Sequence, residues 1–182
     1  MEYPVKIIRD KSFQLPLDLD RLDEFRNHPS KEHLCNGFLR VTDDLRIPFH
    51  KTVLASASSA FMDVLTLKSN IGRREFDPPL PDLEPEKWAE LIDYVYTGDL
   101  VVPDIESCLA WLDVAVALGM GDLKRALFKA VSITEDSVVS TWKATTRGSN
   151  ETCSEKIRGK CVKFILENFF KTGSHDAYKF RA

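Results

Sequence analysis

The side chains that could perform nucleophilic or acid–base chemistry are few, and they are not grouped as catalysis requires. Ser58 and Ser59 are candidate nucleophiles, and His50 is a candidate base. A nucleophilic serine needs a histidine that is itself oriented by an acid, and these serines lack a plausible pair of that kind. A phosphate-binding glycine loop and a dinucleotide fingerprint are also missing from the sequence. We therefore expect no enzymatic activity, and we expect His50 to be a hydrogen-bonded structural histidine.

The histidines and cysteines give little support for a metal site. His28, His33 and Cys35 lie close together in the sequence and could share a metal ion. A tetrahedral zinc site needs a fourth ligand with defined geometry, and no second ligand pair follows, so we expect no metal and no other cofactor. Four irregularly spaced cysteines are expected to be reduced and mostly buried thiols: Cys35, Cys108, Cys153 and Cys161.

The composition is ordinary for a globular protein, and it argues against two classes of partner. The 182 residues are 43% hydrophobic and 29% charged, with a formal net charge of −3. This charge provides no basic field for phosphates, so we expect no direct binding to nucleic acid. No apolar stretch approaches the length of a membrane span, and residues 1–10 do not resemble a signal peptide. We expect a cytoplasmic or nuclear protein that does not bind membranes.

The elements that must position these residues begin with an extended segment, a helix and a hairpin. Residues 1–16 have an extended pattern. Pro16 suits the first turn of a helix over residues 17–27, and the apolar stripe of that helix consists of Leu19, Leu22 and Phe25. Residues 37–41 and 45–49 alternate between apolar and polar around a Thr-Asp-Asp turn, which predicts a β-hairpin.

Helical periodicity dominates the rest of the chain. Residues 50–67 predict two short helices with a break near Ser56–Ser59, and three prolines limit any strand over residues 75–83 to a short or edge strand. A clear helix over residues 85–97 ends at Gly98. A strand over 100–102 and helices over 105–118, 122–131 and 134–143 follow. A capping box at Thr152 and Glu155 begins a last helix through Ile157, Cys161, Phe164, Ile165 and Phe169. This order predicts an α+β fold in which helices cluster against a small sheet.

Three motifs in this order resemble the BTB/POZ family. In the first, a strand end enters a pair of helices, although Phe49 stands directly beside His50 rather than one residue further back. The second runs from a helix into a strand through a Tyr-Thr-Gly sequence, and the third resembles the segment that follows. In that order, the three motifs are Phe49-His50-Lys51-x-Val53-Leu54-Ala55-x-x-Ser58-x-x-Phe61, Leu83-Glu84-Pro85-Glu86-x-Trp88 continuing to Gly98-x-Leu100, and Ala115-x-x-Leu118-x-Met120-x-x-Leu123. The resemblance covers about residues 13–131 and implies a non-enzymatic protein-interaction module.

The resemblance also implies a domain organisation. Residues 1–33 look like the N-terminal extension of the longer BTB form, 34–131 like the BTB core, and 132–182 like a short BACK-type helical segment. In the longer form, the extension packs on a second copy of the domain. A homodimer is therefore expected, and the implied interface consists of Phe13, Leu15, Leu19, Leu22 and Phe25.

Two functions remain open, together with plain oligomerisation. One is a substrate adaptor of a cullin-based ubiquitin ligase, whose implied cullin-binding surface would include Phe61, Met62, Leu65, Ile71 and Glu75. The family's cullin-binding loop usually carries a hydrophobic-x-acid motif, whereas here Arg73 occupies the acid position after Ile71. The helical segment after residue 131 favours the adaptor.

The other function is a transcriptional scaffold that recruits corepressors. In that branch of the family, an acid and a base form a charged pocket at the dimer centre. The implied pocket residues are Asn36, His50 and Lys51, with Asn36 in the place of the acid. In both cases the expected partners are proteins.

Overall fold

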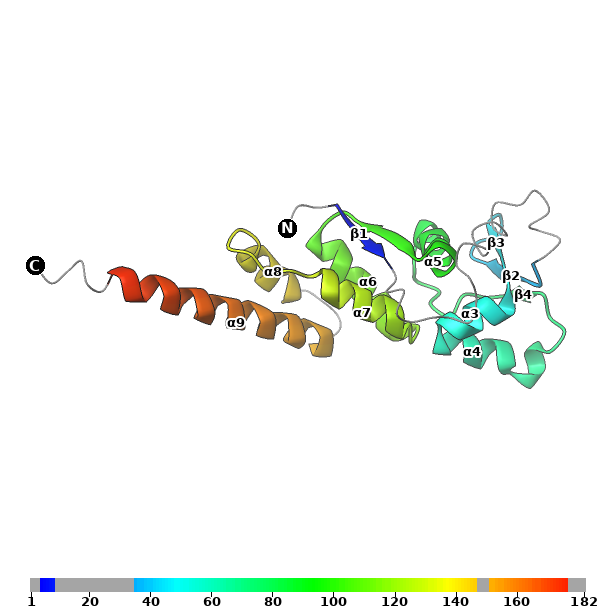
Figure 1. Ribbon diagram of the computed structural model, residues 1–182. Helices are drawn as coiled ribbons and strands as arrows, with labels where there is room; N and C mark the ends of the chain where they lie inside the picture. Colours follow the sequence, from blue (N-terminus) through cyan, green and yellow to red (C-terminus); the bar gives the residue numbers. More distant parts are fainter. Residues whose placement is uncertain (1–3, 9–34, 147–150, 177–182) are drawn as a thin grey trace, which may run out of the picture. The chain divides into compact units, whose positions relative to one another are not determined.

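The computed structural model describes residues 4–8, 35–146 and 151–176, and it describes side chains within the last helix for residues 153–168 (Figure 1). The chain divides into two compact units. Unit 2 comprises Lys6–Val101 and Val114–Ala126, and unit 1 comprises Met1–Val5, Val102–Asp113 and Leu127–Ala182.

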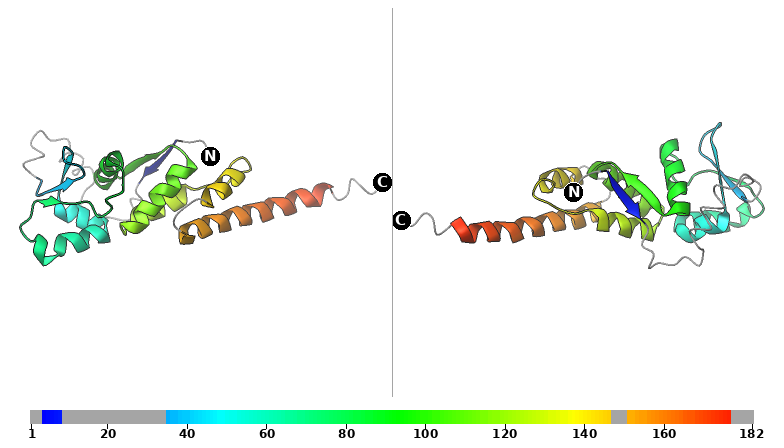
Figure 2. Two further views of the ribbon diagram at one scale, coloured as in Figure 1. Left: turned by 180° about the vertical axis from the view of Figure 1, so that it is seen from behind. Right: turned by 45° about the horizontal axis from the view of Figure 1, so that its top comes forward.

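Two small sheets carry the strands. In the first, β2 (Gly37–Arg40) pairs antiparallel with β3 (Arg46–Phe49) and parallel with the two-residue β4 (Glu75–Phe76). The second pairs β1 (Val5–Ile8) with β5 (Asp99–Val102), and Figures 1 and 2 show these two strands side by side. The predicted hairpin and the short strand near the prolines are both confirmed.

Within the described residues the helices follow the predicted order closely, and the helix predicted over residues 17–27 lies outside those residues. They are α3 (Lys51–Ala57), α4 (Ser59–Thr66), the 3-10 helix η1 (Lys68–Asn70), α5 (Pro85–Thr97), α6 (Ile105–Ala117), α7 (Gly121–Ala130), α8 (Val138–Thr145) and α9 (Glu151–Asp176). Several boundaries differ from the predictions by a residue, and the starts of α8 and α9 bear on local structure. α8 begins at Val138, after a turn in which the Thr134 and Ser137 hydroxyls each accept from the other's backbone N–H, as in a capping box, and the Thr134 carbonyl accepts from the Val138 N–H. α9 begins before Thr152, so Thr152 lies inside the helix rather than at its cap.

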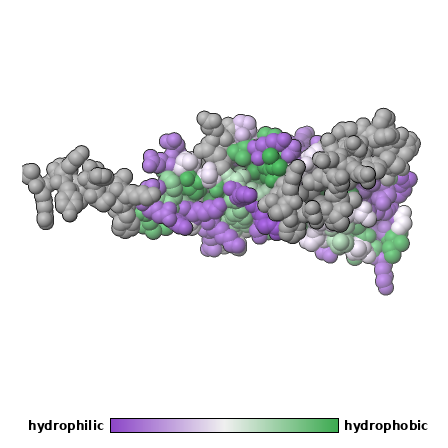
Figure 3. Space-filling model, in the orientation of Figure 1, coloured by the Kyte–Doolittle hydropathy of each residue, from purple (hydrophilic) through white to green (hydrophobic). Residues whose placement is uncertain are grey.

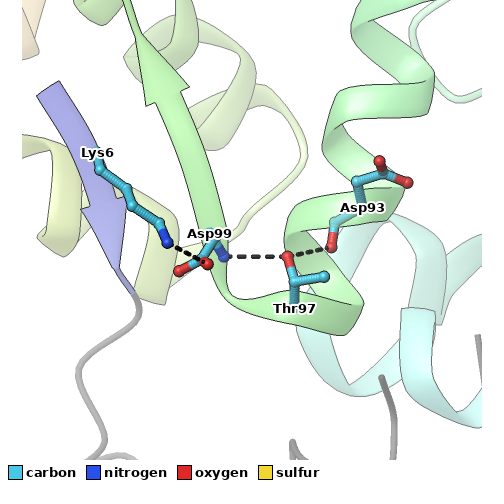
Figure 4. A network of polar contacts seen from close by, with 4 residues as sticks. All are labelled: Lys6, Asp93, Thr97 and Asp99. Carbon is cyan, nitrogen blue, oxygen red and sulfur yellow. Dashed lines mark hydrogen bonds and ion pairs between the residues drawn. The ribbon is translucent and has the colours of Figure 1, made fainter. Parts of the chain in front are cut away.

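The junction from α5 to β5 explains the Tyr-Thr-Gly sequence. Gly98 ends α5 in the left-handed conformation, with φ of 77°, which glycine adopts without a steric penalty. The Thr97 hydroxyl donates to the Asp93 carbonyl (2.8 Å) and accepts from the Asp99 N–H (3.1 Å), while Lys6 on β1 pairs with the Asp99 carboxylate at 2.6 Å (Figure 4). These contacts fix the direction in which the chain leaves the helix.

The break between α3 and α4 is set by Ser58. Its hydroxyl accepts from the Phe61 N–H (3.2 Å) at the start of α4 and donates to the carbonyl of Leu118 (2.6 Å). Gly119 follows with φ of 64°, and a Cβ there would collide with the Ser59 hydroxyl. One buried serine therefore caps a helix and ties it to a distant turn.

The core of unit 2 is built around aromatic rings. Phe61 meets Trp88 edge to face, with centroids 6.0 Å apart, and Phe49 lies 6.4 Å from Phe61 and 6.0 Å from Phe76. All four rings are at most 4% exposed. Burial of this size stabilises the fold by roughly 1.5–3 kcal/mol for each side chain.

In unit 1, α9 has a buried face and a lysine anchor. Ile157 and Cys161 are fully buried, and the Lys160 ammonium donates to the carbonyls of Phe128 (2.7 Å) and Val131 (3.3 Å) near the end of α7. A lysine at these carbonyls satisfies acceptors that the helix itself leaves open. Burial raises the pKa of the Cys108 thiol to about 12. All four cysteines lie among the described residues, where they are buried thiols outside any disulfide, as predicted.

Across the described residues, no helix is both long enough and apolar enough to cross a membrane.

Candidate functional site

His50 sits at the junction of β3 and α3 and is fully engaged in local contacts. Its backbone N–H donates to the Tyr96 hydroxyl (2.8 Å), and its ring Nδ1 lies 2.9 Å from the same oxygen. The tyrosine hydroxyl therefore meets both the backbone and the ring of His50, and the direction of the ring contact depends on the imidazole tautomer. Burial lowers the pKa of the imidazole. The geometry is that of the structural histidine expected from the sequence.

Asn36 and Lys51 meet at the start of α3. The Asn36 side-chain oxygen accepts from the Lys51 backbone N–H at 2.8 Å, while the Lys51 ammonium donates to the Arg73 carbonyl at 2.5 Å. The same ammonium lies 4.9 Å from the centroid of the Phe76 ring. The structure thus brings the three predicted pocket residues together. The Lys51 ammonium contacts the Arg73 carbonyl and the Phe76 ring, and the Asn36 side-chain oxygen accepts a hydrogen bond from the backbone.

The predicted cullin-type surface needs one correction. Phe61 is only 2% exposed because its ring packs against Trp88, so its prediction as a partner contact is wrong. Met62 is 43% exposed and Ile71 is 75% exposed, whereas Leu65 is half-buried. Glu75 is exposed and pairs with Arg46 at 2.8 Å.

Leu67 was not predicted as part of this surface, yet it is 54% exposed. It lies one residue past the end of α4 and just before η1, where the helical pattern stops. An apolar residue directly after the last helical turn was the only sequence signal. We call Met62, Leu67 and Ile71, with the charged residues Lys68 and Arg73 beside them, the α4–η1 surface.

The loop that presents Ile71 is held by hydrogen bonds on both sides. The Asn70 amide, only 8% exposed, donates to the Val64 carbonyl (2.7 Å) and its oxygen accepts from the Arg73 guanidinium (3.1 Å). Gly72 takes φ of 82° directly after Ile71. The backbone on either side of the exposed isoleucine is therefore ordered.

A second apolar surface lies on α8 and α9, within unit 1. It forms an open groove of about 380 Å³ in which, among the described residues, Lys143 is the one charged lining residue. The apolar lining residues are Val138, Val139, Trp142, Val162, Ile165 and Leu166. Ile165, one of the apolar residues at helical spacing in the predicted last helix, is 47% exposed. We call this the α8–α9 groove.

Several predicted residues lie outside the described part of the chain. They include the whole implied dimer interface, Phe13, Leu15, Leu19, Leu22 and Phe25, and two members of the candidate metal group, His28 and His33. Cys35 is buried. Among the described residues, no group of three or more His, Cys, Asp or Glu side chains is placed to hold a metal ion.

The family model of the BTB/POZ domain matches residues 23–133, which is more than half of the 182 residues. The chain belongs to the BTB/POZ domain family. The α+β fold predicted from the sequence is confirmed, and α8 and α9 form a helical continuation beyond the matched residues.

The relatives found by sequence are distant. A BTB/POZ domain-containing protein of Arabidopsis thaliana is 26% identical over 136 residues, covering 73% of this chain and 47% of that protein. Kelch-like protein 7 of Gallus gallus is 35% identical over 69 residues, covering 38% of this chain and 11% of that protein. The chain thus spans about half the length of the first relative and about a tenth of the second.

Solved structures of BTB domains are also similar. The BTB domain of human gigaxonin matches with a TM-score of 0.49 and 24% identity, covering 62% of this chain and 86% of that one. The BTB domain of zebrafish PATZ1 matches with a TM-score of 0.46 and 20% identity, covering 64% and 95% respectively.

BTB/POZ domains mediate protein–protein interactions and dimerisation. Membership of the family therefore makes this chain a protein-interaction module.

Proposed function

We propose that this BTB protein is a homodimeric adaptor that uses the α4–η1 surface to bind a cullin-type scaffold. The observation that carries the proposal is the exposure of Met62, Leu67 and Ile71 beside a firmly packed BTB core. Monomeric soluble proteins rarely leave large apolar side chains clustered in water without a binding role.

The proposed organisation assigns a role to each segment of the chain. Residues 1–33 form the dimerising extension, 34–131 the BTB core, and 132–182 a BACK-like helical segment. The resemblance of the N-terminal segment to the longer BTB form supports this division, and so does the amphipathic stripe on residues 19–25, which needs a cover.

Light scattering on the intact chain tests the dimer. The expected mass is about twice 20.7 kDa, because burying an apolar helix face on a second copy removes it from water. Replacing Leu19 and Phe25 by Ser should shift the mass towards the monomer. A strict monomer of the unmodified chain at micromolar concentration would contradict the dimer.

Purified cullin scaffold tests the adaptor role. Its binding is measured by interferometry against the intact chain and against Ile71→Asp, which should weaken binding by about tenfold or more through loss of apolar contact. Leu45→Ser is the matched control, since Leu45 is an exposed apolar residue in the hairpin turn. Equal binding of all three proteins would remove this loop from the cullin interface.

A plain oligomerisation module is the second candidate. The observation that favours it is Arg73, a base at the position where the family's cullin-binding loop usually has an acid. A stable dimer together with no detectable cullin binding would support this candidate. The transcriptional scaffold has less support, because Asn36 cannot supply the carboxylate that its charged pocket would need.

A further inference from the structure

We propose that the α4–η1 surface recognises an acidic segment of a partner protein, whose apolar side chains pack around Ile71 and whose carboxylates pair with Lys68 and Arg73. This inference rests on the proposed function in one respect, namely that the surface binds a protein. It adds the chemistry of the partner.

The first observation is the exposure of Ile71. At 75% it is the most exposed large hydrophobic side chain among the described residues; Met62 (43%) lies on α4, and Leu67 (54%) lies between α4 and η1. Figure 3 shows hydrophobic and hydrophilic surface side by side at the lower right, where Figure 1 places the end of α4.

The second observation is that three hydrogen bonds hold the backbone around Ile71. The Ile71 N–H donates to the Lys68 carbonyl (3.3 Å), and the Arg73 N–H donates to the Asn70 carbonyl (3.2 Å). The Lys51 ammonium holds the Arg73 carbonyl from α3. An anchored loop loses little conformational entropy on binding, so the exposed isoleucine is preorganised as an anchor.

The third observation is the charge around the anchor. Residues 62–74 contain three cations against a single carboxylate, Asp63. Lys68 and Arg73 flank Ile71 in the sequence, whereas the Arg74 guanidinium donates to the Cys35 carbonyl (3.3 Å). The nearest further acid, Glu75, is already paired with Arg46. A basic rim attracts carboxylates and repels cations, so it selects an acidic partner. An apolar centre with a polar rim is also the usual arrangement of a protein interface.

The test uses the intact chain and a random peptide library displayed on phage. Peptides are selected on the unmodified protein and counter-selected on Ile71→Ser, so that only peptides that depend on Ile71 remain. We expect these peptides to combine apolar residues with an excess of Asp and Glu. The most enriched peptide is then synthesised and titrated by fluorescence polarisation.

Three substitutions define the expected pattern. Ile71→Ser should weaken the peptide by about tenfold or more, and Lys68→Glu by about threefold to tenfold. Arg73→Gln should have an effect similar to Lys68→Glu while keeping a donor for Asn70. Leu45→Ser and Lys156→Glu change exposed residues elsewhere and should leave binding unchanged.

A charge-exchanged peptide, with Lys in place of its acids, should reverse the order and bind Lys68→Glu more tightly than the unmodified chain. The proposal is overturned if no selected peptide depends on Ile71, if such peptides show no acidic excess, or if charge exchange changes nothing. Cullin binding and mass are measured on the same variants. Acidic peptides that bind without any cullin binding would contradict only the proposed function, whereas cullin binding that ignores Lys68 and Arg73 would contradict only this inference.

Discussion

The α4–η1 surface and the α8–α9 groove are both apolar and exposed, yet they differ in charge and in form. The first is a projecting isoleucine with a basic rim on an anchored loop. The second is a depression lined by six apolar residues and Lys143. Exposed apolar area supplies affinity, whereas the charges around it decide which partners are accepted. Only the first surface therefore specifies the chemistry of its partner.

The largest expected effect concerns the buried face of α4, which packs against the core, whereas Met62 on the same helix is exposed. Phe61→Ala should reduce the free energy of unfolding by about 3–5 kcal/mol, because it removes a buried ring that packs against Trp88. Met62→Ala, one residue along α4, should change it by less than about 0.5 kcal/mol. Urea unfolding measures both. Similar losses of unfolding free energy in the two variants would contradict a buried face at Phe61 and an exposed face at Met62.

The α8–α9 groove is tested by a similar pair of substitutions, one at a buried and one at an exposed position of α9. Ile157→Ala should cost about 2–4 kcal/mol, since Ile157 is fully buried. Leu166→Ala, which truncates a half-exposed wall of the groove, should cost less than about 1 kcal/mol. Thermal unfolding followed by circular dichroism checks both values. A large loss for Leu166→Ala would show that the groove is part of a core.

A smaller effect is expected at the lysine that ties α9 to the end of α7. Lys160→Met keeps most of the side-chain volume but removes hydrogen bonds to the Phe128 and Val131 carbonyls, so it should cost about 1 kcal/mol. Lys156→Met is the control, because Lys156 is an exposed lysine on the same helix. Equal stability of the two variants in urea would argue against the anchor.

The smallest effect is a pH dependence at His50, the residue directly before α3. Burial lowers the pKa of folded His50 below the ordinary histidine value of about 6.5, so the unfolded chain binds the proton more readily. The stability from neutral His50 is therefore complete above pH 6.5 and is lost as the pH falls below it. His50→Gln should flatten this part of the profile. An unchanged slope would assign the titration to another group.

Much of the fold could be predicted from local pattern. The hairpin follows from alternation over residues 37–49, the end of α5 from Gly98, and the break between α3 and α4 from the serines near residue 58. These features depend on backbone preferences and short-range capping, which neighbouring residues specify. The start of α8 lies later than predicted, because Thr134 and Ser137 form a capping-box turn ahead of the first helical residue, Val138.

The candidate site was only partly predictable. Ile71 and Met62 were named from the sequence, but Phe61 was grouped with them although it belongs to the core, and Leu67 was missed. Periodicity shows that a helix has an apolar face, but it does not show which of its apolar residues a distant ring will cover. Trp88 lies on α5, so the burial of Phe61 depends on a contact between separate elements.

The sequence by itself therefore determined the order of elements, the BTB/POZ membership and the basic character of the loop after α4. Only the tertiary structure decided how that loop is held, because its anchors come from separate parts of the chain: Lys51 on α3 reaches the Arg73 carbonyl, and Asn70 reaches back to α4. Local pattern follows from neighbouring residues, whereas the presentation of Ile71 depends on contacts that form only once the chain has folded.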